Sequence, residues 1–168
     1  FVLLYLLAPM IADRVKKPFE GAAVQAIYAA PILLFVFPVL ARIEPAAASP
    51  WLLFGTLYVL LALLAWRALA IPKPPIFYVS AFFALAAEAS WSATHLVTER
   101  LGTAILLYAI FGVFYLGVPI AARRMRRPLE PRWGSGAVVL GSLVMLLFLA
   151  AGPRAAAGLW GMAFLLAL

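Results

Sequence analysis

The sequence feature that most constrains the fold is a succession of continuous apolar runs, each close to twenty residues long and separated by short turns. A helix rises about 1.5 Å per residue, so roughly 20 residues cross the hydrocarbon core of a bilayer. Because lipid offers no hydrogen-bond partners, only helices or closed barrels cross it. Barrel strands would alternate in polarity over about ten residues. The runs here are continuous and rich in leucine and alanine, and they therefore predict transmembrane helices.

The composition excludes a water-soluble domain. The chain is 67% hydrophobic and 11% charged, whereas soluble domains are about half apolar and about a quarter charged. It contains no cysteine, which excludes a disulfide framework and a thiol nucleophile within this sequence. The predicted fold class is an all-α integral membrane protein, a polytopic transmembrane helix bundle. We expect membrane lipids to be among its partners.

Seven helices are expected, and prolines and glycines mark the turns between them. No turn is long enough to form a domain. The chain opens and closes inside apolar runs, so we expect residues 1–168 to be a single transmembrane region and a fragment of a longer chain. The expected helices cover residues 1–12, 22–42, 51–70, 75–94, 102–122, 133–151 and 156–168, of which the first and last are truncated.

Basic residues are concentrated in alternate turns. Residues 13–18, 67–73 and 123–132 contain ten of the thirteen Lys and Arg, and the intervening turns contain only Arg42, Arg100 and Arg154. Cytoplasmic turns carry an excess of Lys and Arg. The pattern therefore predicts that the three basic turns, at residues 13–18, 67–73 and 123–132, are cytoplasmic in a multi-pass membrane protein.

The chain also repeats itself. Residues 1–20 align without a gap on residues 111–130, and the alignment includes a charged turn with two prolines, which apolar sequences do not share by chance. The repeat unit therefore covers about residues 1–110, and the second copy begins at about 111. One unit contains four helices, an even number, which predicts parallel four-helix internal repeats.

The repeated motif carries a resemblance to a known family. One helix ends in the pattern Tyr115-x-x-x-Pro119-x-x-Ala-Arg-Arg before a basic turn. Together with the segment at residues 87–101, it resembles the large, repeat-containing bacterial membrane proteins of the domain-of-unknown-function 2339 type. The resemblance implies many further helices on either side and a location in the bacterial cytoplasmic (inner) membrane. It implies no activity and no catalytic residues that can be transferred to this chain.

Glu88 is the only acidic residue well inside an expected helix. An ionised carboxylate is costly in hydrocarbon, so this side chain should be paired, hydrated or protonated. Ser92 and His95 follow at i+4 and i+7 and share its helix face. The three residues can form a proton or cation path, or the acid/base element of a lipid-facing site. In the simplest interpretation, Glu88 hydrogen-bonds a neighbouring helix and His95 lies among lipid headgroups.

The densest basic cluster is formed by Arg123, Arg124, Arg126 and Arg127. It serves as an orientation signal in one interpretation and as a contact for anionic lipid headgroups in the other. We expect no nucleic-acid partner, because no folded basic surface or aromatic platform accompanies the arginines.

Common metal and cofactor chemistry lacks the residues it needs. One histidine, no cysteine and six scattered acids do not make a usual zinc site. The sequence has no Walker-type loop and no dinucleotide fingerprint. We therefore expect no metal, no cofactor and no catalytic residues.

Three classes of function remain open. A structural or scaffolding component of a membrane assembly is favoured, because polar residues are sparse within the helices. Its partners would be other transmembrane helices of the same longer chain or of a complex. A transporter or channel would use Glu88 in a polar path, and a membrane enzyme would act on a lipid or lipid-linked substrate. A transporter should have a water-filled path that reaches Glu88. An enzyme should have a lateral opening toward the lipid, and a scaffold should have neither feature.

Overall fold

The computed structural model describes residues 28–71, 73–127, 129 and 131–150, together with residues 7, 8, 11, 12 and 15. Every element within these residues is helical, as the sequence predicts. The expected helices at residues 1–12 and 156–168 and the first copy of the repeated motif lie outside the described ranges, apart from those few upstream residues. The elements are α2 (Ala29–Ile32), η2 (Leu33–Phe35), α3 (Val36–Ile43), η3 (Pro45–Ala48), α4 (Pro50–Ala70), α5 (Pro74–His95), η4 (Thr98–Arg100), α6 (Leu101–Arg124) and α7 (Arg132–Ala150).

Three of the described helical segments are long and apolar enough to cross a membrane: α4, α5 and the segment Thr98–Arg124. The segments Ala29–Ile43 and Trp133–Leu147 are shorter apolar helices. Helices α4 and α5 begin at Pro50 and Pro74, where the missing N–H of proline costs no intrahelical hydrogen bond. Wherever the structure describes both ends of an expected helix, the predicted and observed ends agree to within about two residues.

The C-terminus of α6 has a left-handed cap without a glycine. Arg126 has a φ of 55°. Its N–H donates to the Arg123 carbonyl over 3.0 Å, and the Arg127 N–H donates to the Ala122 carbonyl over 2.9 Å. These two bonds are the Schellman arrangement, in which glycine is the usual left-handed residue. The basic turn is thus folded back on the end of α6.

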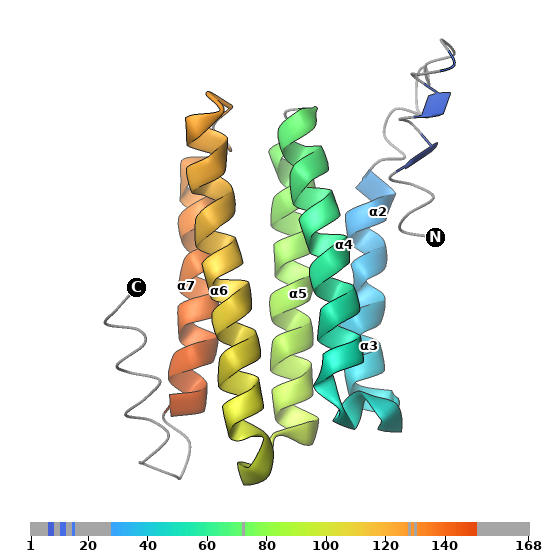
Figure 1. Cartoon of the computed structure of the whole chain (residues 1–168), viewed down its shortest axis with the longest axis vertical. Helices are drawn as coiled ribbons and strands as arrows, with labels where there is room; N and C mark the ends of the chain where they lie inside the picture. The colour runs from blue at the N-terminus through green and yellow to red at the C-terminus, as the bar shows by residue number, and fades with distance from the viewer. Residues whose placement is uncertain are drawn as a thin grey trace.

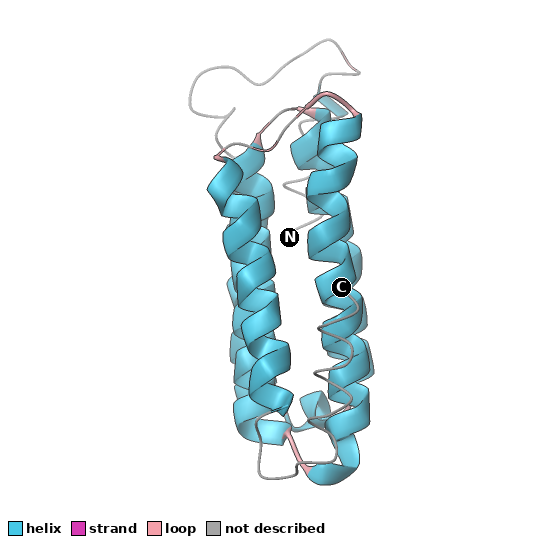
Figure 2. Ribbon diagram, turned by 90° about the vertical axis from the view of Figure 1, so that its left-hand side faces the viewer, coloured by secondary structure: helices cyan, strands magenta, loops and turns pink. Residues whose placement is uncertain are grey.

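The helices form two layers, with α2, α3, α5 and α7 in one layer and α4 and α6 in the other (Figures 1 and 2). Consecutive long helices run in opposite directions, and α5 lies at the centre, in contact with α2, α3, α4, α6 and α7. Its buried face includes Ala81, Ala84 and Ala87, and such small side chains let neighbouring helices approach closely.

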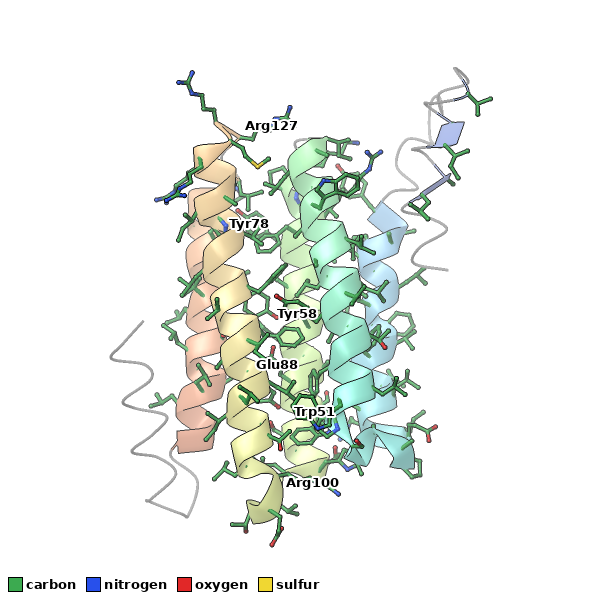
Figure 3. All side chains as sticks on the ribbon, in the orientation of Figure 1. Trp51, Tyr58, Tyr78, Glu88, Arg100 and Arg127 are labelled. Atoms are coloured by element: carbon green, nitrogen blue, oxygen red, sulfur yellow. The ribbon has the colours of Figure 1, made fainter. Side chains whose placement is uncertain are left out.

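The two described basic turns meet at one end of the bundle. The Arg127 guanidinium donates through Nη1 to the Leu69 and Ala70 carbonyls, over 3.0 and 2.9 Å. Arg100 lies at the opposite end (Figure 3). The turn at residues 67–73 is therefore joined to the turn after α6, as the alternation of charge in the sequence requires.

Glycines on α7 provide a test of this packing. A Cβ atom on Gly134 would lie 2.8 Å from Cζ of Tyr78, whereas one on Gly136 would have no heavy atom within 4 Å. The Tyr78 ring is held in place because its hydroxyl donates to the Pro131 carbonyl over 3.0 Å.

Gly134→Ala should therefore lower the free energy of unfolding by about 1–2 kcal/mol through overpacking. Gly136→Ala, two residues further along the same helix, should raise it by about 0.5 kcal/mol through reduced freedom of the unfolded chain. The measurement is unfolding by sodium dodecyl sulfate in mixed micelles. Equal effects of the two substitutions would contradict the described contact between α5 and α7.

Candidate functional site

Glu88 lies in the C-terminal half of α5 and is completely buried (Figure 3). The Tyr115 hydroxyl on α6 donates to its Oε1 over 3.4 Å. Its other oxygen, Oε2, has no hydrogen-bond partner among the described residues. The carboxyl group is thus held from one side by α6, and half of its hydrogen-bonding capacity is unused within the described bundle.

A second tyrosine of α6 completes the contact with α5. The Tyr108 hydroxyl donates to the Glu88 backbone carbonyl over 2.7 Å and lies 2.6 Å from Oγ of Ser92. A tyrosine hydroxyl has one proton, and a carbonyl can only accept. The Ser92 hydroxyl therefore donates to the Tyr108 oxygen, and the three groups form a short chain of hydrogen bonds between the helices.

Aromatic rings surround this chain. The Phe54 ring of α4 packs edge-on against Trp91, Tyr108 and Phe111, with centroids 5.9, 6.0 and 5.9 Å away. All four of these side chains are buried. Edge-to-face pairs of this kind add about 0.5–1.5 kcal/mol each beyond the contact area. The polar groups therefore lie in a buried layer of aromatic side chains formed by α4, α5 and α6.

His95 takes part in a different contact. Its Nε2 lies 2.9 Å from the Ala41 carbonyl of α3, and Nε1 of Trp91 donates to the Ala47 carbonyl over 2.7 Å. Glu88 and Ser92 contact α6 instead. The shared helix face predicted for the three residues is therefore divided between two neighbouring helices, and the described hydrogen bonds do not connect His95 to Glu88.

The sequence pattern alone did not identify Tyr108 and Tyr115 as partners of Glu88. The available signal was the spacing of Tyr108, Gly112 and Tyr115, which places all three on one face of α6. A Cβ atom on Gly112 would lie 3.1 Å from Oγ of Ser142, a buried hydroxyl of α7 that also has no partner in the described part of the chain.

The four arginines of the basic cluster have separate environments. Arg127 bonds the end of α4, and Arg126 occupies the left-handed cap of α6. Arg123 lines a groove between α6 and α7, and Arg124 is exposed on the last turn of α6. All four side chains are exposed, and Arg127 alone among them is described as donating to backbone carbonyls of α4.

Three surface hollows of about 400, 260 and 390 Å³ lie on the described part of the protein. Glu88, Ser92 and His95 line none of these three. No group of three or more His, Cys, Asp or Glu side chains that could hold a metal ion occurs among the described residues.

Comparison with protein-family models, with curated proteins and with solved structures finds no match.

Proposed function

We propose that this chain is part of a multi-pass membrane protein of the bacterial inner membrane, and that its role is structural. In this proposal it holds transmembrane helices together within a larger membrane assembly. The observation that carries the proposal is the buried hydrogen-bond chain of Glu88, Tyr108 and Ser92, which joins α5 to α6 inside a bundle whose outer surface is apolar.

The outward faces of the helices support insertion in a membrane. Val59, Phe82, Val113 and Leu140, on α4, α5, α6 and α7, are each more than half exposed. Large apolar side chains exposed on every long helix are unfavourable in water and favourable against lipid or other apolar helices. Charged side chains, by contrast, are confined to the ends of the helices, with the exception of Glu88.

The surroundings of Glu88 support a structural role. Its side chain is completely buried and accepts a hydrogen bond from Tyr115 of α6, as expected of a contact between packed helices. Polar side chains that pair between transmembrane helices contribute about 0.6 kcal/mol each on average. Their effect is mainly to define which helix faces meet.

A second candidate is a proton or cation path through the same layer. It is favoured by one observation: Oε2 of Glu88 and Oγ of Ser142 are both buried without a partner among the described residues. Ionisable groups within membrane helices are commonly functional. Proton flux through proteoliposomes that contain the unmodified protein or the Glu88→Gln variant separates this candidate from the structural role.

The resemblance to the domain-of-unknown-function 2339 type is also part of the proposal. The motif that carries it, from Tyr115 to Arg124, occupies the second half of α6, so it combines the Glu88 donor, a helix proline and the basic end of the bundle. Under this assignment the parallel four-helix repeats continue beyond the present sequence.

Sidedness provides the test of membrane insertion. The protein has no native cysteine, so single cysteines report one position each. Met125 and Val97 are exposed turn residues at opposite ends of α6. Met125→Cys should react with a membrane-impermeant maleimide only from the cytoplasmic face, and Val97→Cys only from the opposite face. Labelling of both from one side, or recovery of the protein in the aqueous fraction after alkaline carbonate extraction, would refute the proposal.

A further inference from the structure

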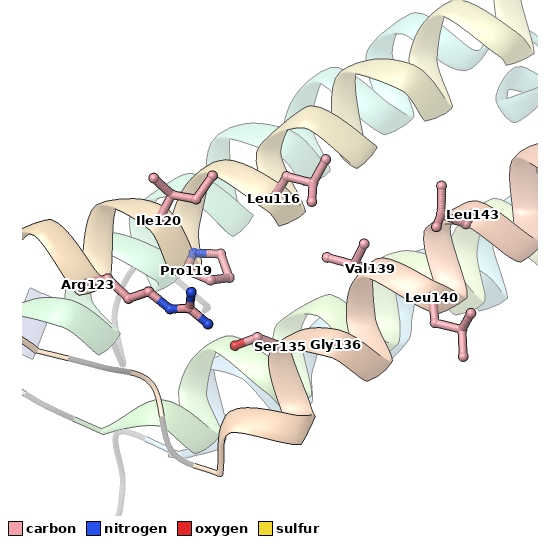
Figure 4. Close-up of a pocket in the computed structure, with 9 residues that line it drawn as sticks. All are labelled: Leu116, Pro119, Ile120, Arg123, Ser135, Gly136, Val139, Leu140 and Leu143. Carbon is pink, nitrogen blue, oxygen red and sulfur yellow. The ribbon is translucent and has the colours of Figure 1, made fainter. Parts of the chain in front are cut away.

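A groove of about 400 Å³ runs between α6 and α7 near the basic end of the bundle (Figure 4). Most of its wall is apolar, and its rim residues Ile120 and Leu140 are more than half exposed, so the groove faces outward. The lining residues are Leu116, Pro119, Ile120, Arg123, Ser135, Gly136, Val139, Leu140 and Leu143.

The two ends of the groove differ in polarity. Arg123 extends from α6 toward Ser135 of α7 at one end, and only apolar side chains, including Leu116 and Leu143, line the other (Figure 4). Arg124 and Arg126 add positive charge to the same end of the bundle. A ligand that fits this pattern has an anionic head at the helix ends and an apolar tail directed toward the middle of the bundle.

We propose that the groove binds one anionic phospholipid, with its phosphate on the Arg123 guanidinium and an acyl chain along Leu116, Val139 and Leu143. This inference rests on the proposed membrane insertion. It assigns to one arginine and one groove the lipid contact that the sequence suggested only for the whole cluster. Guanidinium groups bind phosphate oxygens through charge-assisted hydrogen bonds, and the cytoplasmic leaflet supplies anionic lipids.

The volume of the groove is compatible with part of a lipid molecule, because it lies in the range of about 300–1,000 Å³ that is typical of small-molecule sites. Gly136 leaves open space in the wall, because a Cβ atom there would meet no heavy atom within 4 Å.

Three variants separate the parts of the proposal. Arg123→Ala removes the charge that contacts the headgroup. Gly136→Leu fills the groove without changing any charge. Arg124→Ala is the matched control, because it removes the same charge from an exposed position that does not line the groove.

The measurement is native mass spectrometry of the full chain, purified in detergent and titrated with phosphatidylglycerol or with phosphatidylcholine of identical acyl chains. Arg123→Ala should weaken phosphatidylglycerol binding about tenfold, as expected for loss of a charge-assisted hydrogen bond. Gly136→Leu should weaken it to a similar extent, and Arg124→Ala should change it by less than about twofold. Phosphatidylcholine has the same phosphate but also a choline cation, which the nearby arginines repel, so it should bind the unmodified protein about tenfold more weakly than phosphatidylglycerol.

Equal losses from Arg123→Ala and Arg124→Ala would overturn the proposal, because they would indicate diffuse attraction to the whole basic end. Thermal unfolding shows whether the Gly136→Leu variant is folded. If it is folded and its affinity for phosphatidylglycerol is unchanged, the assignment of the acyl chain to the groove is overturned. A second protein copy retained in place of lipid would also overturn it. These outcomes are distinct from failure of membrane insertion, which the cysteine labelling and carbonate extraction report independently.

Discussion

Replacing Trp91 by alanine should lower the free energy of unfolding by about 3–5 kcal/mol, the range found when large aromatic core residues are truncated. Trp91 is completely buried, and its ring packs edge-on against Phe54. The substitution leaves a cavity where the indole ring packs against Phe54. It also leaves the Ala47 carbonyl without the indole donor that lies 2.7 Å away.

The control for this prediction is Trp133→Ala. Trp133 is 75% exposed, so its truncation should change the free energy of unfolding by no more than about 0.5 kcal/mol. Trp91→Phe should give an intermediate loss, because it keeps an aromatic ring but removes the second ring of the indole together with its N–H. Unfolding by sodium dodecyl sulfate in mixed micelles measures all three. A Trp91→Ala loss as small as that of Trp133→Ala would show that α5 does not pack against η3 and α4 as described.

Replacing Glu88 by alanine should lower the free energy of unfolding by about 2–4 kcal/mol. The loss has two sources: the cavity left by the side chain, and the buried Tyr115 hydroxyl, which loses the acceptor it contacts over 3.4 Å. Glu88→Gln keeps the volume and a carbonyl acceptor, so it should stay within about 1 kcal/mol of the unmodified protein. Glu99→Ala, at an exposed acid, is the control and should have an effect below about 0.5 kcal/mol.

The same variants decide between the two candidate functions. Under the structural role, proteoliposomes containing the unmodified protein and the Glu88→Gln variant should show the same background proton flux with a pH-sensitive dye. A flux above background that Glu88→Gln abolishes, with stability retained, would replace the structural role by the proton path. A Glu88→Gln loss of stability as large as that of Glu88→Ala would contradict the expectation that an amide can replace Glu88 as the acceptor for Tyr115.

The sequence predicted the position of Glu88 within its helix but not its partners. Spacing along one helix places Ser92 and His95 on the same side as Glu88. A helix face at the centre of a bundle is wide enough to meet two neighbours, however, and α5 meets α6 through Glu88 and Ser92 and α3 through His95. Which residues form one site therefore depended on where the neighbouring helices lie.

The contacts of the basic cluster also depended on tertiary structure. In the sequence the cluster is one short run, formed by Arg123, Arg124, Arg126 and Arg127. The left-handed cap at Arg126 turns the chain sharply, and Arg127 then reaches the end of α4, while Arg123 remains on α6 beside the groove. The left-handed conformation of the single residue Arg126 therefore gives Arg123 and Arg127 different contacts, although they are close in the sequence.

The sequence by itself determined the helical fold class, the ends of α4, α5 and α6, and the grouping of basic turns at alternate connections. These properties follow from apolar length, proline positions and charge, all of which act locally along the chain. Tertiary structure decided that Tyr108 and Tyr115 meet Glu88, that His95 turns to α3, and that a groove opens beside Arg123. Helical periodicity defines which residues share a face, and only the packing of whole helices selects the side chains that cover that face.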